Sequence, residues 1–298
     1  MTPGRTGWRE RSRLVRWTRL WRTRAPKTFR DKVRYKMLRD HRPLIVAFAD
    51  KVAVRDYVAE VIGRQYLPDV FAVLDDPETL ASLELPDRYV VKPTHGSGAA
   101  VVVSPLAPDG ARMPADPGSW QYSLVRPARA DKRQLIDLAS GWIAQLYGQG
   151  PNREWVYGQV PRRIIVEELL EGPGGAIPDD LKFFVFHGRC RFIQVDAGRF
   201  GGRTQDFFLP GWEHLPLSGG PPWASVEPPP PARLAEMISL SEHLGAETDF
   251  VRVDLYDVDG RIVFGELTSF PAGGDSPFQP DSYNAVFGAG WTVPRRYR

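Results

Sequence analysis

The sequence predicts an α+β protein, in which pairs of strands alternate with helices. Apolar residues recur at helical spacing in residues 50–66 and again in residues 131–148. Short apolar runs of the strand type lie between and after these segments, bounded by glycine or proline. The pair Asp259-Gly260 separates two alternating segments, which is a strong signal for a β-hairpin. With 298 residues, the chain can form one large domain or two packed lobes.

Charge is distributed unevenly along the chain. Residues 1–42 contain 15 Lys/Arg and 3 Asp/Glu, so the remainder is acidic although the whole chain has a net charge of +3. The single cysteine, Cys190, excludes an internal disulfide framework and fits a reducing cytosol. No apolar run approaches the roughly 20 residues that a membrane-spanning helix needs. We therefore expect a cytoplasmic protein.

The basic beginning of the chain mixes tryptophan and leucine with arginine. On a helix, Leu14, Trp17 and Trp21 would form an apolar stripe flanked by arginines. This pattern predicts a basic helical extension whose residues 5–24 touch an anionic membrane peripherally. The alternatives are a solvated extension and a helix docked on the rest of the protein. Because the rest of the chain is acidic, we do not expect a nucleic-acid partner.

The first half of the body is predicted to contain three helices and three strands. Glycine ends the first helix, and proline ends the first strand because it cannot donate a hydrogen bond to a sheet. In chain order we expect helix 50–66, a short helix 75–85, strand 88–93, strand 101–103, an irregular stretch 105–130, helix 131–148 and strand 162–170.

The second half is predicted to be richer in strands. Two apolar runs surround the turn His187-Gly188, which indicates a pair of antiparallel strands. A Pro/Gly-rich connector then leads to one helix and the hairpin around Asp259-Gly260. In chain order we expect strand 182–186, strand 189–195, connector 219–231, helix 232–244 and the hairpin 252–268.

This hairpin carries Asp254 on one arm and Glu266 on the other. With a two-residue loop, pairing would place the two carboxylates on opposite faces. A three-residue loop, formed by 258–260 with glycine in the left-handed position, would place them on one face as diagonal neighbours. We expect the three-residue loop.

On that face, Arg252 and Thr268 would accompany the two carboxylates. Carboxylate and hydroxyl oxygens suit Mg²⁺, which takes one or two carboxylates together with substrate phosphates. The alternative from the residues alone is a solvated hairpin whose charges face water.

A glycine turn and two lysines have the character of a phosphate site. In Gly96-Ser97-Gly98, glycine allows backbone N–H groups to approach phosphate oxygens closely. Lys92 precedes this turn on an otherwise apolar strand, and Lys182 begins another apolar strand. Neither a Walker phosphate loop nor a Rossmann glycine motif is present in the sequence. A plain hairpin turn with edge lysines is the alternative.

These pieces occur in a characteristic order. It runs through Lys51, Val91-Lys92-Pro93, the glycine turn, Val166-Glu167-Glu168-Leu169-Leu170, Asp179-Asp180-Leu181-Lys182, Arg252-Val253-Asp254 and Gly265-Glu266-Leu267-Thr268. The ordered set resembles the ATP-grasp fold, and most closely its TupA-like group, named after a teichuronopeptide-biosynthesis protein. The resemblance runs from residue 26 to residue 288. It implies two α+β lobes that clasp ATP, preceded by the basic helical extension.

The resemblance also implies a division of the chain and a nucleotide site. The extension would occupy residues 1–42, the first lobe residues 43–165, and the second lobe with the metal-binding hairpin residues 166–298. Two lysines would contact the α- and β-phosphates, the turn at 95–99 would close over the phosphates, and the acidic strand end would line the adenine site. The residues expected to bind ATP are Lys51, Lys92, His95, Gly96, Ser97, Gly98, Glu167, Glu168, Leu169 and Lys182.

By the same resemblance, the hairpin would bind the metal. Asp254 and Glu266 would hold one or two Mg²⁺ ions that bridge the β- and γ-phosphates. Thr268 stands where many ATP-grasp proteins have asparagine, and its hydroxyl is a shorter and weaker ligand. Arg252 and Lys182 are the expected catalytic residues, with Arg252 stabilising the charge of the transferred phosphoryl group.

The reaction implied is an ATP-dependent ligation of a carboxylate to an amine. The carboxylate would attack the γ-phosphate to give an acylphosphate and ADP, and an amine would then displace phosphate. Such a ligase, acting on small-molecule or polymer substrates, would serve cell-surface polysaccharide or polymer synthesis, or specialised metabolism. Three alternatives stay open: a kinase of the same fold acting on a sugar or glycan hydroxyl, a nucleotide-binding protein of the membrane surface, and a glycosyltransferase of polysaccharide biosynthesis.

Overall fold

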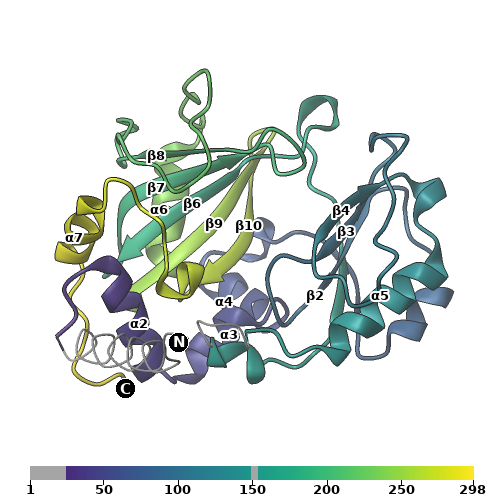
Figure 1. The fold of residues 1–298 in the computed structure, drawn as a ribbon, viewed down its shortest axis with the longest axis horizontal. Coiled ribbons are helices and arrows are strands. Elements are labelled where there is room, and N and C mark those ends of the chain that lie inside the picture. Colours follow the sequence, from purple (N-terminus) through teal and green to yellow (C-terminus); the bar gives the residue numbers. More distant parts are fainter. Residues whose placement is uncertain (1–24, 149–153) are drawn as a thin grey trace, which may run out of the picture.

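Two lobes, each built on a five-stranded sheet, make up the protein (Figure 1). The computed structural model describes residues 25–148 and 154–298. Helices accompany both sheets, so the predicted α+β class is confirmed. The basic segment 5–24, for which membrane contact was predicted, lies outside the described residues. None of the helices in the described part of the chain is long and apolar enough to cross a membrane.

The first sheet has the strand order β1-β5-β2-β3-β4, and only its β3–β4 pair is parallel. Its strands are β1 (Val70–Leu74), β2 (Tyr89–Pro93), β3 (Ala100–Val103), β4 (Tyr122–Val125) and β5 (Ile164–Glu167). Helix α5 (Lys132–Ala144) is capped by Asp131, whose side chain accepts the backbone N–H of Gln134 at 2.9 Å. The helix buries Trp142 against the sheet.

One part of the first lobe differs from the expectation. The stretch 105–130 was expected to be irregular, yet it contains β4, which pairs with β3. This strand has only four residues and lies among proline and glycine, so its local pattern is too short to indicate a strand. The strand forms because it pairs with the buried strand β3, although its own sequence pattern does not indicate a strand. The short helix expected at 75–85 is the 3₁₀ helix η2 (Pro77–Ser82).

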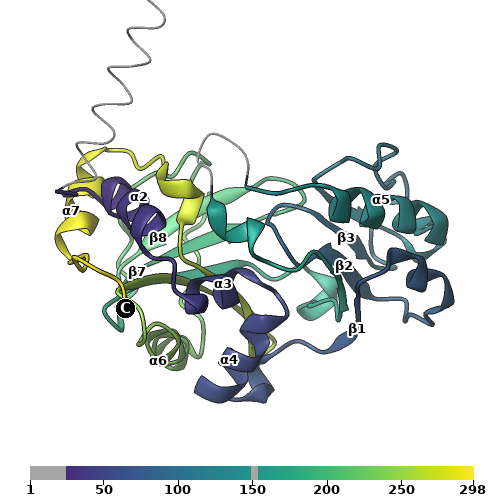
Figure 2. The same ribbon diagram turned by 90° about the horizontal axis from the view of Figure 1, so that it is seen from below.

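The second sheet is antiparallel throughout and has the order β10-β9-β6-β7-β8. Its strands are β6 (Asp180–Phe186), β7 (Arg189–Ala197), β8 (Thr204–Phe208), β9 (Phe250–Val258) and β10 (Arg261–Thr268). The helices around it are α2 (Phe29–Arg39), α3 (Pro43–Ala49), α4 (Ala53–Val61), α6 (Leu234–Leu244) and α7 (Ser282–Ala289). Figure 2 shows α4 beside α6 on one side of this sheet, and α2 beside α7.

The two faces of the second sheet have different environments. On β6, Phe183 and Val185 point into a core that α4 and α6 complete. Alternate residues point to the other face, where Phe184 and Phe186 join a second, aromatic core with α2 and α7. On that same face, Lys182 lies beyond the aromatic core and lines a cleft. The second face is therefore divided into an apolar half and a polar half.

The predicted first lobe, residues 43–165, includes helices α3 and α4. Both pack against the second sheet, because Phe48 and Val58 belong to the core beneath β6 and β9. The predicted boundary between residues 165 and 166 falls inside β5. Helix α3 also packs on β10, which places Lys51, two residues beyond the helix, in the cleft.

The hairpin of β9 and β10 corrects the predicted loop. Val258 pairs with Arg261, so the loop has the two residues Asp259 and Gly260, both with positive φ (52° and 79°). The predicted three-residue loop is therefore wrong. Such a two-residue turn with positive φ at both positions matches the twist of the strands and is common in hairpins.

A β-bulge at Gly265 instead brings the carboxylates together. The pairing shifts by one residue between Phe264 and Glu266, so that Asp254 lies directly opposite Glu266. The two residues were expected to be diagonal neighbours. The predicted common face is thus present, but the bulge rather than the loop produces it.

Glycine is required at the bulge. A Cβ atom on Gly265 would lie 2.9 Å from Cε2 of Tyr256 and 3.1 Å from the carbonyl oxygen of Asp254. We expect Gly265→Ala to lower the free energy of unfolding by about 1–3 kcal/mol, because the neighbours must shift. Urea denaturation measures this change. Gly110→Ala is the control, since no atom lies within 4 Å of a Cβ at that position; equal stability of the two variants would contradict the constraint.

Candidate active site

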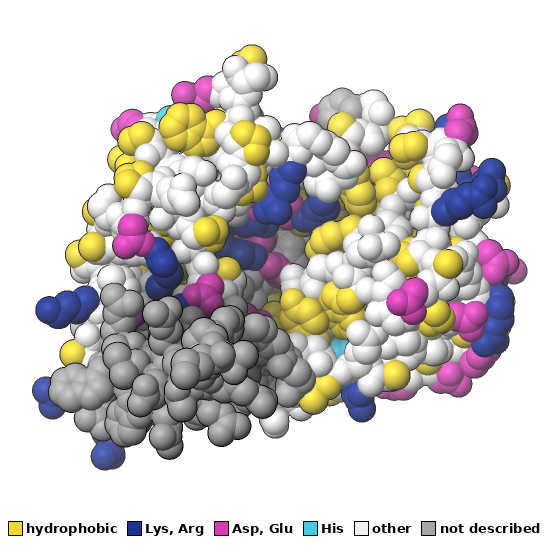
Figure 3. Space-filling view, in the orientation of Figure 1, with side chains coloured by type: hydrophobic (Ala, Val, Ile, Leu, Met, Phe, Trp, Pro, Cys, Tyr) yellow, Lys and Arg dark blue, Asp and Glu magenta, His cyan; other side chains and the backbone are white. Residues whose placement is uncertain are grey.

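A cleft of about 570 Å³ lies between the two lobes. Small-molecule sites occupy roughly 300–1,000 Å³. Every strand of the second sheet contributes side chains to the cleft, and β2, β3, β4 and β5 contribute from the first sheet. Figure 3 shows the hollow between the lobes, with Lys and Arg side chains along its edge.

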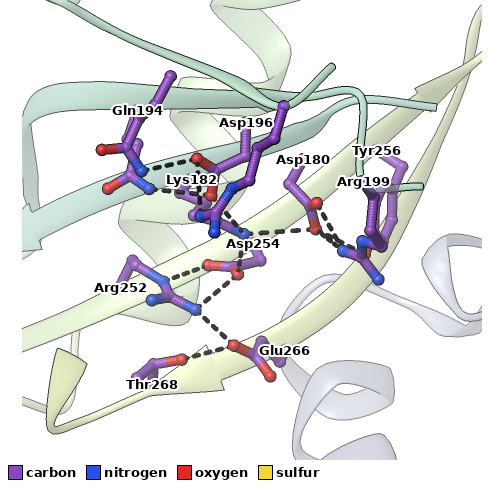
Figure 4. A network of polar contacts seen from close by, with 12 residues as sticks. Asp180, Lys182, Gln194, Asp196, Arg199, Arg252, Asp254, Tyr256, Glu266 and Thr268 are labelled. Atoms are coloured by element: carbon purple, nitrogen blue, oxygen red, sulfur yellow. Dashed lines mark hydrogen bonds and ion pairs between the residues drawn. The ribbon is translucent and has the colours of Figure 1, made fainter. Parts of the chain in front are cut away.

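Arg252 holds the two hairpin carboxylates together (Figure 4). Its Nε donates to Oδ1 of Asp254 and its Nη2 to Oδ2, each at 2.7 Å, which is a bidentate contact. Nη2 also donates to Oε1 of Glu266. Asp254 is only 2% exposed, so this ion pair compensates a buried charge.

Lys182 lies on the other side of Asp254. The two residues are opposite each other on β6 and β9, and Nζ of Lys182 donates to Oδ2 of Asp254 at 3.0 Å. The same Nζ lies 3.3 Å from Oδ1 of Asp180 and 3.6 Å from Oδ2 of Asp196. Although burial disfavours the charge, these carboxylates raise the pKa of Lys182, so it stays cationic.

Neighbouring cations keep the hairpin carboxylate Glu266 ionised despite its burial. Burial opposes ionisation of Glu266, but Arg252, Lys182 and Lys51 outweigh it and lower its pKa to about 2. Burial raises the pKa of Asp254, while Arg252 and Lys182 act in the opposite direction. Glu266 therefore carries a full negative charge at neutral pH.

The donor set fits Mg²⁺. Asp254, Glu266 and Thr268 offer only oxygen atoms from one face, and all three line the cleft. Among the described residues, no group of three or more His, Cys, Asp or Glu could hold a metal by itself. Mg²⁺ usually takes one or two carboxylates and completes its shell with water and phosphate oxygens, so two carboxylates suffice.

Thr268 forms a hydrogen bond with Glu266. Its hydroxyl donates to Oε1 of Glu266 at 2.9 Å, and it lies opposite Arg252 in the register. The hydroxyl therefore orients the carboxylate. Direct metal binding by Thr268 stays a prediction.

On the other side of the cleft, the predicted phosphate-binding residues come together. Lys51, Lys92 and the turn 96–98 all line the cleft. Lys51 donates through Nζ to the carbonyl oxygen of Gly96, so this lysine touches the turn itself. Lys92 forms an ion pair with Glu167 on the neighbouring strand β5. The side chains of Lys51 and Lys92 and the glycine turn thus lie together on one part of the cleft.

His95 lies behind the glycine turn. It is fully buried, and its Nε2 is 3.1 Å from the carbonyl oxygen of Trp142. It does not line the cleft, unlike Gly96, Ser97 and Gly98. The ring packs edge-on against Trp120, whose Nε1 donates to the carbonyl oxygen of Ser97 at 2.7 Å. His95 therefore supports the turn from within the first lobe, and its predicted role in nucleotide binding is indirect in this arrangement.

The predicted adenine-binding stretch follows β5. Glu167 and Glu168 line the cleft, and Glu168 forms an ion pair with Arg261 of β10, which links the two lobes. Leu170 lines the cleft, whereas Leu169 does not. Leu170, rather than the expected Leu169, therefore places its side chain in this part of the cleft.

A cluster beside Lys182 was not assigned from the sequence. Arg199 and the hydroxyl of Tyr256 both donate to Asp180, the latter at 2.8 Å. Burial opposes ionisation of Asp180, but Lys182 and Arg199 outweigh it and lower its pKa to about 2. Arg199 also lies over the ring of Tyr122 of the first lobe, at 5.1 Å from its centre. Arg199 follows β7 in a glycine-rich stretch, where no periodic pattern indicates which way a side chain points.

The family follows from a comparison with family models. The model described as TupA-like ATPgrasp matches residues 31–107 and 137–291, which is most of the chain. The chain belongs to this family. The predicted TupA-like ATP-grasp membership is thereby confirmed. None of the curated proteins matches the sequence.

Several solved ATP-grasp ligases are similar to this ATP-grasp chain. D-alanine–D-alanine ligase from Bacillus anthracis is 17% identical with a TM-score of 0.42, covering 82% of this chain and 64% of that one. L-amino acid ligase from Bacillus licheniformis is 15% identical with a TM-score of 0.41, covering 78% and 46%. ATP-grasp ligase PsnB with its minimal precursor is 13% identical with a TM-score of 0.37, covering 76% and 54%. The chain thus spans about half to two thirds of the length of these enzymes.

Lys51 gives the ATP-grasp cleft a testable proton linkage. Burial, with help from neighbouring Lys92, lowers the pKa of Lys51 to about 8. Phosphate oxygens would raise that pKa again, so nucleotide binding near pH 8 should take up a fraction of a proton. Calorimetric titration with Mg-ADP in two buffers of different ionisation enthalpy measures the uptake. Lys51→Arg keeps the charge but does not titrate in this range, and undiminished uptake in this variant would contradict the assignment.

Proposed function

We propose that this ATP-grasp chain is an ATP-dependent carboxylate–amine ligase that works with Mg²⁺. The observation that carries the proposal is the row Glu266, Asp254 and Lys182 on three neighbouring strands, which lines the same cleft as the glycine turn. In this row Arg252 bridges the two carboxylates, and Lys182 contacts Asp254. Two carboxylates with two fixed cations suit the transfer of a phosphoryl group.

Phosphoryl transfer asks for positioning and charge neutralisation rather than a protein nucleophile. Arg252 and Lys182 supply positive charge beside the hairpin, and both are held by buried carboxylates. The single cysteine takes no part, because burial raises the pKa of the Cys190 thiol to about 12. Mg²⁺, when bound by Asp254 and Glu266, would neutralise phosphate charge.

The proposed reaction has two steps that balance. A carboxylate oxygen of the first substrate attacks the γ-phosphorus of ATP, the bond to the β-phosphate oxygen breaks, and ADP leaves. The amine nitrogen of the second substrate then attacks the acyl carbon, the bond to the phosphate oxygen breaks, and phosphate and a proton leave as the amide forms. Arg252 would face the phosphoryl group in the first step and the leaving phosphate in the second.

For the biological setting, we propose assembly of a cell-surface polysaccharide or polymer, or of a specialised metabolite. The resemblance to the TupA-like group, which is named after a teichuronopeptide-biosynthesis protein, supports the first of these. A cytoplasmic location, with peripheral membrane contact through residues 5–24, belongs to the same proposal.

The reaction type is tested by trapping the intermediate. With Mg-ATP, hydroxylamine and a panel of carboxylic acids, we expect ADP and a coloured hydroxamate, because hydroxylamine attacks an acylphosphate. A kinase acting on a hydroxyl would give ADP with sugar acceptors but no hydroxamate. That result would contradict the ligase and favour the kinase.

The same assay tests the hairpin. Asp254→Asn keeps the shape of the side chain but removes the charge, so hydroxamate formation should fall by roughly 100-fold or more. Asp259→Asn at the exposed tip of the same hairpin is the matched control, because asparagine tolerates positive φ. Equal activity of the two variants would show that Asp254 does not serve the reaction.

A further inference from the structure

Three aromatic side chains from separate parts of the chain meet beside the glycine turn. Trp120 lies two residues before β4, Tyr147 three residues after α5, and Tyr157 in the 3₁₀ helix η4 (Trp155–Gly158). The rings of Trp120 and Tyr147 are stacked with their centres 5.1 Å apart, and Tyr157 meets Tyr147 edge-on at 4.8 Å. We call these three residues the aromatic stack. Of the three, only Tyr157 lines the cleft.

The aromatic stack contacts the glycine turn at two positions. Nε1 of Trp120 donates to the carbonyl oxygen of Ser97 at 2.7 Å. Both neighbouring rings also lie against Gly96, where a Cβ atom would be 2.5 Å from Cζ2 of Trp120 and 2.7 Å from Cγ of Tyr147. Glycine at position 96 therefore allows the turn to approach the rings this closely.

These contacts order a segment that would otherwise have many conformations. Two of the three residues of the turn are glycine, and Gly98 has a positive φ of 93°. If such a segment became ordered only when a ligand bound, the loss of conformational freedom would weaken binding. Lys51 donates to the carbonyl oxygen of Gly96, and Trp120 donates to that of Ser97. Two successive carbonyl groups of the turn are thus fixed without a ligand.

The aromatic stack is itself anchored in both lobes. Trp120 packs against the core of the first sheet. Tyr157 packs against the aromatic core of the second lobe, and its helix η4 packs on α3. The edge-on contact between Tyr147 and Tyr157 therefore joins the lobes beside the turn. Because the rings at its two ends are held by close-packed cores, the stack gives the turn a fixed support.

We propose that the aromatic stack is a positioning device for nucleotide binding, in which Trp120 holds the glycine turn at the place where it binds the phosphates of ATP. This assignment rests on the proposed ATP-dependent function. Trp120 lies outside the cleft, so it acts through Ser97 and not by touching the nucleotide. It is therefore a positioning residue, and its contribution is to reduce the ordering of the turn that binding requires.

The deciding variant is Trp120→Phe, which keeps an aromatic ring in the stack but removes the hydrogen bond to Ser97. Calorimetric titration of the full chain with Mg-AMPPNP measures the Kd. We expect the Kd to rise about fivefold, the effect of losing one hydrogen bond. Trp212→Phe is the matched control, because Trp212 also stacks on a ring, that of Phe208, and donates through Nε1 to the carbonyl oxygen of Pro228 at 3.0 Å, outside the cleft. This control should leave the Kd unchanged.

Amide hydrogen exchange separates a positioning role from a general loss of stability. Without nucleotide, Trp120→Phe should raise the exchange rate of residues 95–99 and leave that of β6 unchanged. Faster exchange throughout the chain would show that Trp120 only stabilises the fold, and would overturn the proposal. An unchanged Kd, or unchanged exchange of the turn, would also overturn it but leave the proposed ATP-dependent function in place. Failure of the native protein to bind Mg-AMPPNP would contradict that function and the proposal together.

Discussion

The ion pairs of Arg252 with Asp254 and Glu266 are the interactions on which the site depends. Two carboxylates placed opposite each other on neighbouring strands repel, and burial makes each charge costly. The guanidinium bridges them, and Lys182 adds a second cation on the far side of Asp254. Loss of one partner of a buried ion pair leaves an uncompensated charge and strongly destabilises the protein. These residues therefore depend on one another. The proposed chemistry uses the same charges that fold the hairpin.

The second sheet can support this polar network because its two faces have different environments. One face packs against helices, and the other changes from apolar to polar along the strands. Alternate residues of β6 and β9, such as Phe183 and Val253, fill the core under α4 and α6. The opposite face begins with an aromatic cluster and continues into the cleft, so that Phe184 and Lys182 are neighbours on one strand. The aromatic half anchors α2 and α7, while the polar half remains open to a ligand. A rigid scaffold thus carries the catalytic candidates, as precise positioning requires.

The sequence predicted the class of fold, the order of the main elements and the face that carries Arg252, Asp254, Glu266 and Thr268. Alternation and charge are local signals, so they could be read directly. The bulge at Gly265 could not, because it depends on which residues pair across the hairpin. For the same reason the loop length was wrong although the resulting face was right.

Long-range packing accounts for the other gaps between sequence and structure. His95 occupies a core position that becomes apparent only when α5 and Trp120 surround it. Asp196 and Gln205 meet through strand register, from strands whose sequences show no shared motif. Such pairings are set by the sheet as a whole, so a local reading of each strand misses them.

The central claim is that the paired carboxylates bind a divalent metal together with a nucleotide. Electron paramagnetic resonance of Mn²⁺ tests it most directly, because free and bound Mn²⁺ give different signals. The structure predicts weak Mn²⁺ binding by the protein alone, where Arg252 occupies the carboxylates, and strong binding when AMPPNP is added. Glu266→Gln should abolish the strong binding. Mn²⁺ binding that is indifferent to nucleotide, or unchanged in Glu266→Gln, would contradict the account.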